Sequence, residues 1–202
     1  AALLDKDIEG AESAYTAMQE LTPDEKPARE ARESMALRIG FGMQRFLHER
    51  RRRQEEHRKR LLPPAATVRV CIERYSRLQL NGMASVLGLE GLKRPTKESL
   101  LDRITAALED ADHVRALGAA LPAEAAKAMT ELLSRGGRMP FDEFTKRHGS
   151  DKGDGESWGW STPKSAMGRL KALGFLTEGT VGGEASVLVP AEVRSALALK
   201  SA

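Results

Sequence analysis

The sequence predicts a mainly α-helical protein whose last third contains a short β-hairpin. Apolar residues recur at spacings of three and four along most of the chain, as they do on one face of a helix. Near the C-terminus, two short apolar runs flank a glycine-rich turn, which is typical of a hairpin. Prolines and glycines divide the 202 residues into three predicted domains, 1–64, 65–117 and 118–202.

The first domain is expected to be an N-terminal helical hairpin that includes a long basic helix. Thr22 to Glu25 has the pattern of a capping box, although Pro27 allows a later helix start. Nothing breaks the helix before Pro63, and about 35 residues would make it about 50 Å long. The preceding helix carries an apolar stripe with 4-3-4-3 spacing, which consists of Leu4, Ile8, Ala11, Tyr15 and Met18.

The second domain contains one ambiguous segment and one clear helix. Val68, Val70 and Ile72 alternate with polar residues, so this segment could be a strand, but a helix continuing to residue 78 is equally compatible. After turn residues at 91–95, Thr96 or Pro95 is placed near the cap of a helix that ends near Leu108. The buried face of that helix is expected to be Leu100, Leu101, Ile104 and Leu108.

The third domain is expected to hold three helices, a hairpin and a final helix. Glycines end the first helix at 136–137 and the third at 174, and a polar glycine-rich loop, 149–159, precedes the third. In the third helix, a period of 3.6 residues turns Gly168, Arg169 and Ala172 outward. The expected ranges are helices 122–134, 139–148 and 161–173, strands 175–178 and 185–189, and a last helix 191–199.

The positive charge of the chain is concentrated in one short stretch. The whole sequence has 32 Lys and Arg against 29 Asp and Glu, a net charge of +3. Residues 45–62 alone contain eight basic and three acidic residues. Lys and Arg near phosphates release counterions, so this stretch is the first candidate for contact with nucleic acid.

The third domain resembles a winged helix domain over about 80 residues. The most specific match runs from Ser161-Thr162-Pro163 to the step Leu173-Gly174-Phe175-Leu176. The resemblance implies that the third helix leads through this step into the first strand of the wing. It also implies that outward side chains of that helix enter a groove of DNA.

The second domain resembles a SAP-type helix–turn–helix, on Leu80, Leu87-Gly88-Leu89, Lys97, Leu100-Leu101 and Arg103-Ile104. In that family the turn between the helices faces DNA phosphates, and here it reads Lys93-Arg94-Pro95-Thr96-Lys97. With residues 188–193 near the end, the two units in tandem look like the non-catalytic domain of bacterial relatives of XPB-type helicases. That resemblance implies an accessory DNA-binding piece rather than a helicase motor.

The predicted nucleic-acid contacts come from the basic helix, the turn and the third winged helix. The alternative for the basic helix is a solvated face on which Glu49, Glu55 and Glu56 pair with the arginines. The alternative for the third helix is packing against a partner protein, and Trp158 and Trp160 could stack on a base or pack over the core. The predicted contact residues are Arg50, Arg53, Arg58, Lys59, Arg60, Lys93, Arg94, Lys97, Lys164, Ser165, Arg169 and Lys171.

The sequence offers no pattern for catalysis, a metal or a cofactor. Cys71 is the single cysteine, and the four histidines lack metal-ligand spacing. Residues 151–156 have the wrong side chains for a calcium loop, because Gly153 stands where an oxygen ligand is needed. Phosphate-binding and nucleophile-elbow motifs are also missing.

The sequence therefore predicts a non-enzymatic DNA-binding accessory protein of a DNA-processing, repair or defence machine, with a helicase or another protein subunit as partner. The alternative is a protein-interaction subunit without direct DNA contact, and RNA is a third candidate ligand. A self-complementary stripe on the first helix would make a homodimer. Without a long apolar run or a secretory signal, a cytoplasmic protein with no membrane contact is expected.

Overall fold

The computed structural model describes residues 58–89, 95–154 and 161–198, together with His48, Arg52, Glu55, Glu56 and Trp158. The chain divides into two compact units, 1–56 and 57–202, and the elements named below all belong to the second. The predicted helical hairpin, its apolar stripe and the dimer that would use this stripe lie outside the described residues. The predicted boundaries at 64 and 117 stay predictions.

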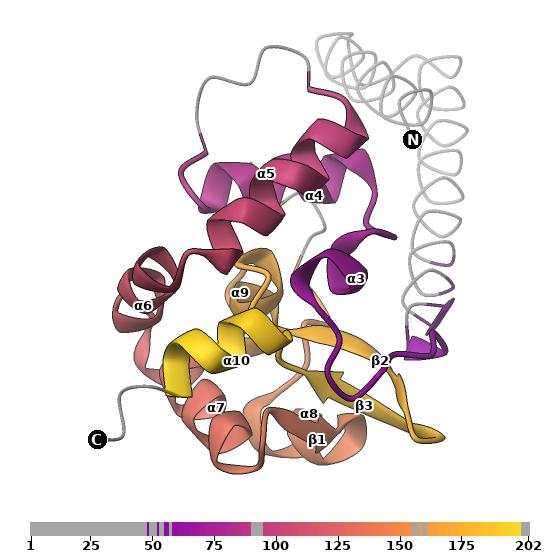
Figure 1. Ribbon diagram of the computed structural model, residues 1–202. Helices are drawn as coiled ribbons and strands as arrows, with labels where there is room; N and C mark the ends of the chain where they lie inside the picture. The colour runs from indigo at the N-terminus through magenta and orange to yellow at the C-terminus, as the bar shows by residue number, and fades with distance from the viewer. Residues whose placement is uncertain are drawn as a thin grey trace, which may run out of the picture. The chain divides into compact units, whose positions relative to one another are not determined.

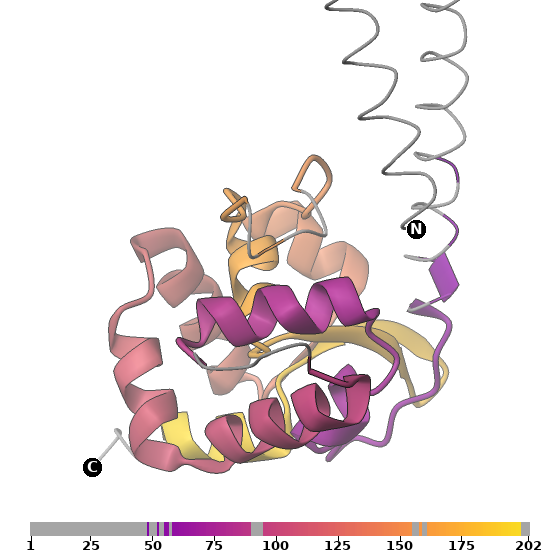
Figure 2. The same ribbon diagram turned by 90° about the horizontal axis from the view of Figure 1, so that it is seen from above.

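The first part of the second unit consists of four helices, α3 (Val68–Ile72), α4 (Arg77–Val86), α5 (Lys97–Glu109) and α6 (Ala111–Ala119) (Figure 1). Side chains cap the start of each helix. Ser76 makes a full capping box with Gln79, in which each side chain bonds the backbone N–H of the other. Of the two candidate caps of α5, Thr96 is the one that caps it, and its hydroxyl accepts the N–H of Ser99 at 3.1 Å. α4 and α5 pack side by side and run in the same direction (Figures 1 and 2).

The second part combines helices with a small antiparallel sheet. The sheet order is β1-β3-β2, so the central strand is the last of the three in the chain. In the register, Val187 of β3 lies opposite Met139 of β1 and Glu178 of β2. The elements are α7 (Ala123–Ser134), β1 (Arg138–Pro140), α8 (Phe141–His148), α9 (Ala166–Ala172), β2 (Thr177–Val181), β3 (Glu184–Leu188) and α10 (Ala191–Ala198).

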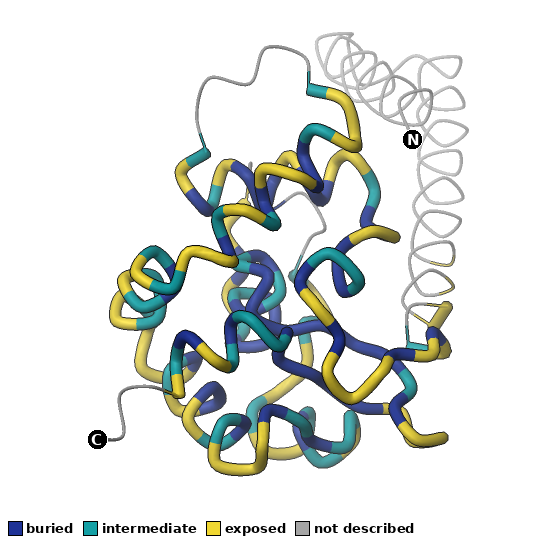
Figure 3. The backbone as a smooth tube through the Cα atoms, in the orientation of Figure 1, coloured by how far each residue is buried: buried dark blue, intermediate teal, exposed yellow. Residues whose placement is uncertain are grey.

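One hydrophobic core runs through both parts of the unit, and β2, β3 and the inner faces of the helices are buried (Figure 3). Gly174, between α9 and β2, lies against helices of the first part. Its φ of 71° lies in the region that favours glycine. A methyl group there would lie 2.7 Å from Cδ1 of Leu108 on α5 and 2.9 Å from Cε of Met83 on α4. The backbone conformation therefore favours glycine, and a larger residue would also displace the ends of two core side chains.

The chain enters this unit along the free edge of β2. The N–H of Thr180 donates to the Arg60 carbonyl at 2.7 Å, and the Leu62 N–H donates to the Thr180 carbonyl at 2.9 Å. Residues 60–62 thus extend the sheet as a short parallel neighbour of β2. The side chain of Leu61 points away from the core, since the residue is 79% exposed, whereas Leu62 is buried.

The coarse fold prediction is confirmed: the described chain is mainly helical, with a small sheet near its C-terminus. The ambiguous segment around Val70 is helical rather than extended. Two boundaries were wrong, because Met139 begins no helix but lies in β1, and the third helix starts at Ala166 rather than near Ser161. The separate helix α6 was not predicted. Within the described residues, no helix has the length and apolar character needed to cross a bilayer.

Candidate nucleic-acid interface

The predicted contact residues of the basic helix are only partly described. Arg50 and Arg53 lie outside the described residues. Arg52, which is described, forms an i,i+4 ion pair with Glu56 at 3.6 Å, with both side chains more than half exposed. This single pair agrees with the alternative of a solvated, internally paired helix face, although exposed pairs of this kind contribute little to stability.

Arg60 is buried and serves the fold. Its Nη2 forms hydrogen bonds with the Val70 carbonyl and with Oε1 of Glu73, the latter at 2.6 Å, and its Nη1 donates to the Cys71 carbonyl at 3.4 Å. These carbonyls belong to the last turn of α3, where helical carbonyls lack partners within the helix. The guanidinium therefore caps α3, and only 7% of the side chain is exposed. It is not available to a phosphate in this structure.

Arg58 is also engaged internally, whereas its neighbour Lys59 is exposed. The guanidinium of Arg58 lies 4.6 Å from the centre of the Phe141 ring, and its Nε lies 3.4 Å from Oε2 of Glu178. Among the described residues, Lys59 has no acidic partner. Of Arg58, Lys59 and Arg60, which end the basic stretch 45–62, only Lys59 is therefore exposed and without an acidic partner among the described residues.

Lys171 sits in a buried cluster of charges rather than on the surface. Its ammonium contacts Oδ2 of Asp151 at 2.6 Å and Oε1 of Glu178 at 2.7 Å, and 12% of its side chain is exposed. Burial alone would lower the pKa of Lys171, but the carboxylates of Glu178 and Asp151 outweigh burial and raise this pKa above its usual value. The lysine is therefore held charged and fully paired.

The start of α9 is covered by residues 151–154. The carboxylate of Asp154 accepts the N–H of Lys164 at 2.9 Å, the N–H of Ser165 at 3.0 Å and the Ser165 hydroxyl at 2.5 Å. Ser165 Oγ in turn accepts the N–H of Gly168 and caps α9. The Lys164 side chain is exposed, and Arg169 is half-buried with its Nε donating to the Pro163 carbonyl at 3.0 Å.

The prediction that Gly168 and Ala172 face outward was wrong, because both are buried. A methyl group at Gly168 would collide with the Asp154 carboxylate and would lie 2.9 Å from Cβ of Pro163. Residues of the preceding loop thus pack onto the face of α9 that helical periodicity assigned to solvent. Helical periodicity identifies one apolar face but does not reveal a loop that covers another.

A different group of open cations, by which we mean exposed Lys or Arg side chains without an acidic partner among the described residues, lies at the starts of α4 and α5. Arg77 is the first residue of α4 and Lys97 the first of α5, and Arg74 precedes α4 by three residues. All three residues are exposed, and none has an acidic partner among the described residues. We call Arg74, Arg77 and Lys97 the α4–α5 basic surface.

Two observations place these cations on one side of the helix pair. Figures 1 and 2 show that α4 and α5 begin at the same end of the pair. Arg69 of α3, which lies just before Arg74 in the chain, pairs with Glu98 and Asp102 in the first two turns of α5. Of the predicted residues only Lys97 belongs here, because Lys93 and Arg94 lie outside the described residues. Sequence reasoning missed Arg74 and Arg77, although the Ser76 capping signal could have placed Arg77 at a helix start.

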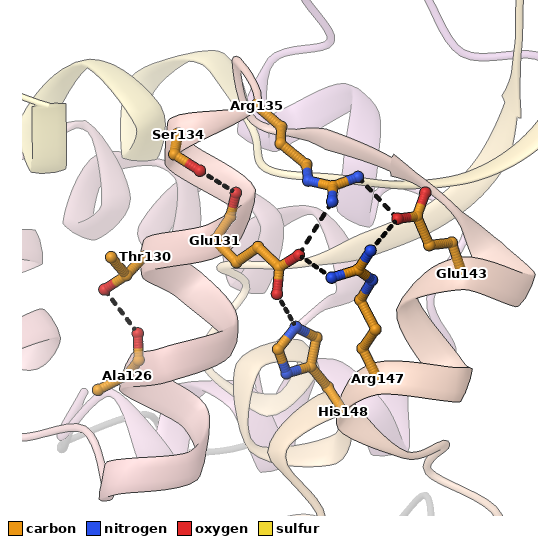
Figure 4. A network of polar contacts seen from close by, with 8 residues as sticks. All are labelled: Ala126, Thr130, Glu131, Ser134, Arg135, Glu143, Arg147 and His148. Carbon is orange, nitrogen blue, oxygen red and sulfur yellow. Dashed lines mark hydrogen bonds and ion pairs between the residues drawn. The ribbon is translucent and has the colours of Figure 1, made fainter.

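Four charged side chains between α7 and α8 pair with one another in the structure. Figure 4 shows Glu131 and Glu143 interleaved with Arg135 and Arg147. Arg135 and Arg147 each contact both carboxylates at 2.8–3.1 Å. The buried His148 ring adds a contact between its Nε2 and Oε2 of Glu131 at 2.9 Å. This network ties the two helices together and leaves its own charges paired.

The other side chains considered in the sequence are the two tryptophans and the cysteine, and those that the structure describes are buried. Trp158 is buried, and its ring meets that of Tyr75 edge to face at 5.7 Å, while Trp160 lies outside the described residues. Cys71 is a buried free thiol. Within the described part of the chain, no group of three or more His, Cys, Asp or Glu side chains is arranged to hold a metal ion.

Because of two buried groups, the Cys71 thiol and the Tyr75 hydroxyl, we expect the protein to lose stability at alkaline pH. Burial raises the pKa of the Cys71 thiol and that of the Tyr75 hydroxyl to about 12 each. In the unfolded chain these groups lose their protons near pH 9 and 10, so the unfolded state binds fewer protons above those values. The free energy of unfolding should therefore fall as pH rises, by about 2 kcal/mol between pH 9 and 11 from Cys71 alone.

Urea denaturation at pH 7, 9, 10 and 11 checks this expectation. A Cys71→Ala variant is the control, since it should be less stable at pH 7 and show a flatter decline between pH 9 and 11. Equal slopes in the two proteins would contradict the role of the buried thiol.

Comparisons with known proteins leave the function open. No protein-family model, curated protein or solved structure matches this chain. The resemblances to a winged helix domain and to a SAP-type unit therefore stay predictions.

Proposed function

We propose that the chain is a non-enzymatic DNA-binding accessory protein of a DNA-processing, repair or defence machine. The observation that carries this proposal is the α4–α5 basic surface. Arg74, Arg77 and Lys97 present three open cations at the adjacent starts of two helices. Cations on one face can follow the phosphates of a nucleic-acid backbone and release their counterions.

The arrangement of elements supports the same proposal. The order α7-β1-α8-α9-β2-β3, with the sheet order β1-β3-β2, is the connectivity expected for a winged helix domain. The parallel pair α4 and α5, joined by residues 87–96, is the arrangement expected for a SAP-type unit. Fold alone does not establish a function, so the proposal depends on the open cations rather than on the resemblance.

Two further predicted residues are exposed cations elsewhere in the described chain. Lys59 is exposed at the end of the basic helix, and Lys164 is exposed at the start of α9. Arg58, Arg60 and Lys171 are left out of the proposed interface, because each is engaged within the fold. The proposed contact residues within the described chain are therefore Lys59, Arg74, Arg77, Lys97 and Lys164.

A double substitution tests the α4–α5 basic surface. Arg77→Ala/Lys97→Ala should weaken binding to a labelled DNA duplex about tenfold at low salt. It should also reduce the slope of log affinity against log salt by about two, because two phosphate contacts are lost. Fluorescence anisotropy across a salt series measures both quantities, with single-stranded DNA and double-stranded RNA as competitors.

The matched control is Lys127→Ala/Lys146→Ala, which removes two exposed cations from α7 and α8 and changes the net charge equally. It should change affinity less than threefold. An equal loss in both variants would mean that only net charge matters, and absence of DNA binding at low salt would overturn the proposal. Preferential binding of RNA would keep the surface but change the ligand.

A protein-interaction role is the second candidate, and the β2–β3 hairpin favours it. The turn at Gly182 and Gly183 is followed by Glu184, and residues 180–185 contain no basic side chain. A wing of this composition has no cation for a phosphate, and Glu184 itself lies 3.8 Å from Arg138. If the salt series shows no DNA binding, this hairpin is the first surface to examine for a protein partner.

A further inference from the structure

One side of α4 is exposed, and the helix contains no acidic residue. The other sides of α4 are mostly buried, and the helix contacts α5 and α9. Leu78, Asn81 and Ser85 are exposed. At 3.6 residues per turn these three side chains and Arg77 fall within an arc of about 100° around the helix axis. We call Leu78, Asn81 and Ser85 the α4 outer face.

The α4 outer face makes no polar contact within the described part of the chain. Neither the Asn81 amide nor the Ser85 hydroxyl forms a hydrogen bond there. Leu78 is 43% exposed and is one of only two large apolar residues that are exposed among the described residues. An amide that both donates and accepts, a hydroxyl and an apolar group are therefore available on one face to another molecule.

The open cations of the α4–α5 basic surface lie at the start of this face. Arg77 begins α4 and directly precedes Leu78, whereas Asn81 lies one turn further along the helix. Lys97 begins the neighbouring helix, and the two helices start at the same end of the pair. Phosphate contacts fix the position of a protein on nucleic acid, and base contacts read its sequence. Cations at the start of α4 would thus hold a phosphate backbone beside the uncharged α4 outer face.

The chemistry of the α4 outer face matches the edges of base pairs in the major groove of DNA. That groove admits an α-helix, and in it an Asn amide can bond N6 and N7 of adenine together. An apolar side chain can contact the methyl group of thymine in the same groove. Because α4 has no carboxylate, nothing on the helix repels the phosphates that border the groove. The major groove of an RNA duplex is too narrow for such a helix.

The helix α9, which the resemblance to a winged helix domain assigns to a groove of DNA, is less available. Gly168 and Ala172 are buried, and the ammonium of Lys171 is bound to two carboxylates. In the described chain, α4 therefore offers the more open face for contact with bases.

We propose that α4 is a base-reading helix that enters the major groove of duplex DNA, where Asn81 bonds adenine and Leu78 contacts thymine. This inference rests on the proposed function, because the α4–α5 basic surface holds the phosphates while α4 reads the bases. Leu78 and Asn81 are three residues apart, which is about 4.5 Å along the helix axis. Base pairs are about 3.4 Å apart, so the adenine and the thymine lie within about two base pairs of each other.

Selection from a library of random DNA duplexes tests whether the chain reads a sequence. The enriched duplexes should contain an adenine and a thymine at one fixed separation. By fluorescence anisotropy, an enriched duplex should bind at least about tenfold more tightly than a shuffled duplex of the same base composition at the same salt concentration.

Modified bases test the two assigned contacts atom by atom. Replacing the adenine with 7-deazaadenine removes N7 in the major groove and leaves the minor groove unchanged. This replacement should weaken binding of the unmodified chain about tenfold, and binding of Asn81→Ala less than twofold. Replacing the thymine with uracil removes only the methyl group. It should weaken binding of the unmodified chain about threefold, and leave binding of Leu78→Ala unchanged.

The salt series and a matched variant control for nonspecific effects. Asn81→Ala should leave the salt slope unchanged, whereas Arg77→Ala/Lys97→Ala reduces it. Thr130→Ala removes an exposed uncharged side chain from α7 and should change affinity less than twofold. Alanine favours a helix more than asparagine does, so Asn81→Ala should remain folded. Thermal unfolding of each variant checks this.

The outcomes separate this inference from the proposed function. If the chain binds duplex DNA but enriches no sequence, α4 reads no bases, and the proposed function stands. A preference for base composition without fixed positions also overturns the inference, as does an equal effect of 7-deazaadenine on the unmodified chain and on Asn81→Ala. Tighter binding of an RNA duplex overturns it as well. If no duplex binds at low salt, both proposals fail together.

Discussion

Replacing Lys171 with methionine should lower the free energy of unfolding by about 3–5 kcal/mol, because it breaks a buried ion cluster by removing one partner. Methionine fills most of the volume but leaves the carboxylates of Glu178 and Asp151 without their shared ammonium. Glu178 is affected most, since 5% of its side chain is exposed. Arg58, at 3.4 Å from Glu178, compensates only in part. Urea denaturation measures the loss.

A triple variant tests whether uncompensated charge is the cause. Adding Glu178→Gln and Asp151→Asn to Lys171→Met removes both carboxylates and should recover most of the lost stability. Lys146→Met, at an exposed position of α8, is the control and should change stability by less than about 0.5 kcal/mol. A loss below about 1 kcal/mol for Lys171→Met would show that the cluster contributes little.

Arg60→Ala should lower stability without changing DNA binding, whereas Lys59→Ala should weaken DNA binding without changing stability. The two residues are nevertheless neighbours in one basic run. Removing Arg60 leaves the carbonyls of Val70 and Cys71 without their donor and should lower stability by about 3 kcal/mol. Removing Lys59 takes away only an exposed cation, so stability should change by less than about 0.5 kcal/mol.

DNA affinity provides the second half of this comparison. Lys59→Ala should weaken binding and reduce the salt slope by about one. Arg60→Ala, measured at a temperature where the variant is folded, should leave the slope unchanged, because its guanidinium is bound within the fold. A reduced slope for Arg60→Ala with no loss of stability would contradict the structural role assigned to it.

The elements that the sequence predicts well are those that local signals define. Thr96 marks the start of α5, and Leu100 to Leu108 form its buried face, because capping and helical periodicity need only neighbouring residues. Met139 was placed in a helix because β1 exists only through its pairing with β3, some 48 residues later by the register with Val187. The helix α6 was missed because Asp110 ends one helix and caps the next without a glycine or proline between them.

The candidate site could be predicted less well than the fold, for a physical reason. Arg60 and Lys171 look like open cations in the sequence, but their partners lie 7 to 20 residues away in the chain and meet them only through tertiary packing. Conversely, Arg74 and Arg77 belong to no conspicuous basic run and become notable only because a second helix begins beside them. The sequence shows how many Lys and Arg residues the chain has, but only the folded structure shows which of them are exposed and unpaired.

The short parallel pairing of residues 60–62 with β2 also protects the protein from unwanted self-association. It satisfies both backbone groups of Thr180 on a strand that would otherwise form an open sheet edge. An open edge is a template for strands of other molecules and a common starting point for aggregation. A shortened chain that began at Pro63 would keep every strand that the structure describes and most of the described core, yet it would expose this edge. Truncation for solubility should therefore preserve residues 58–62.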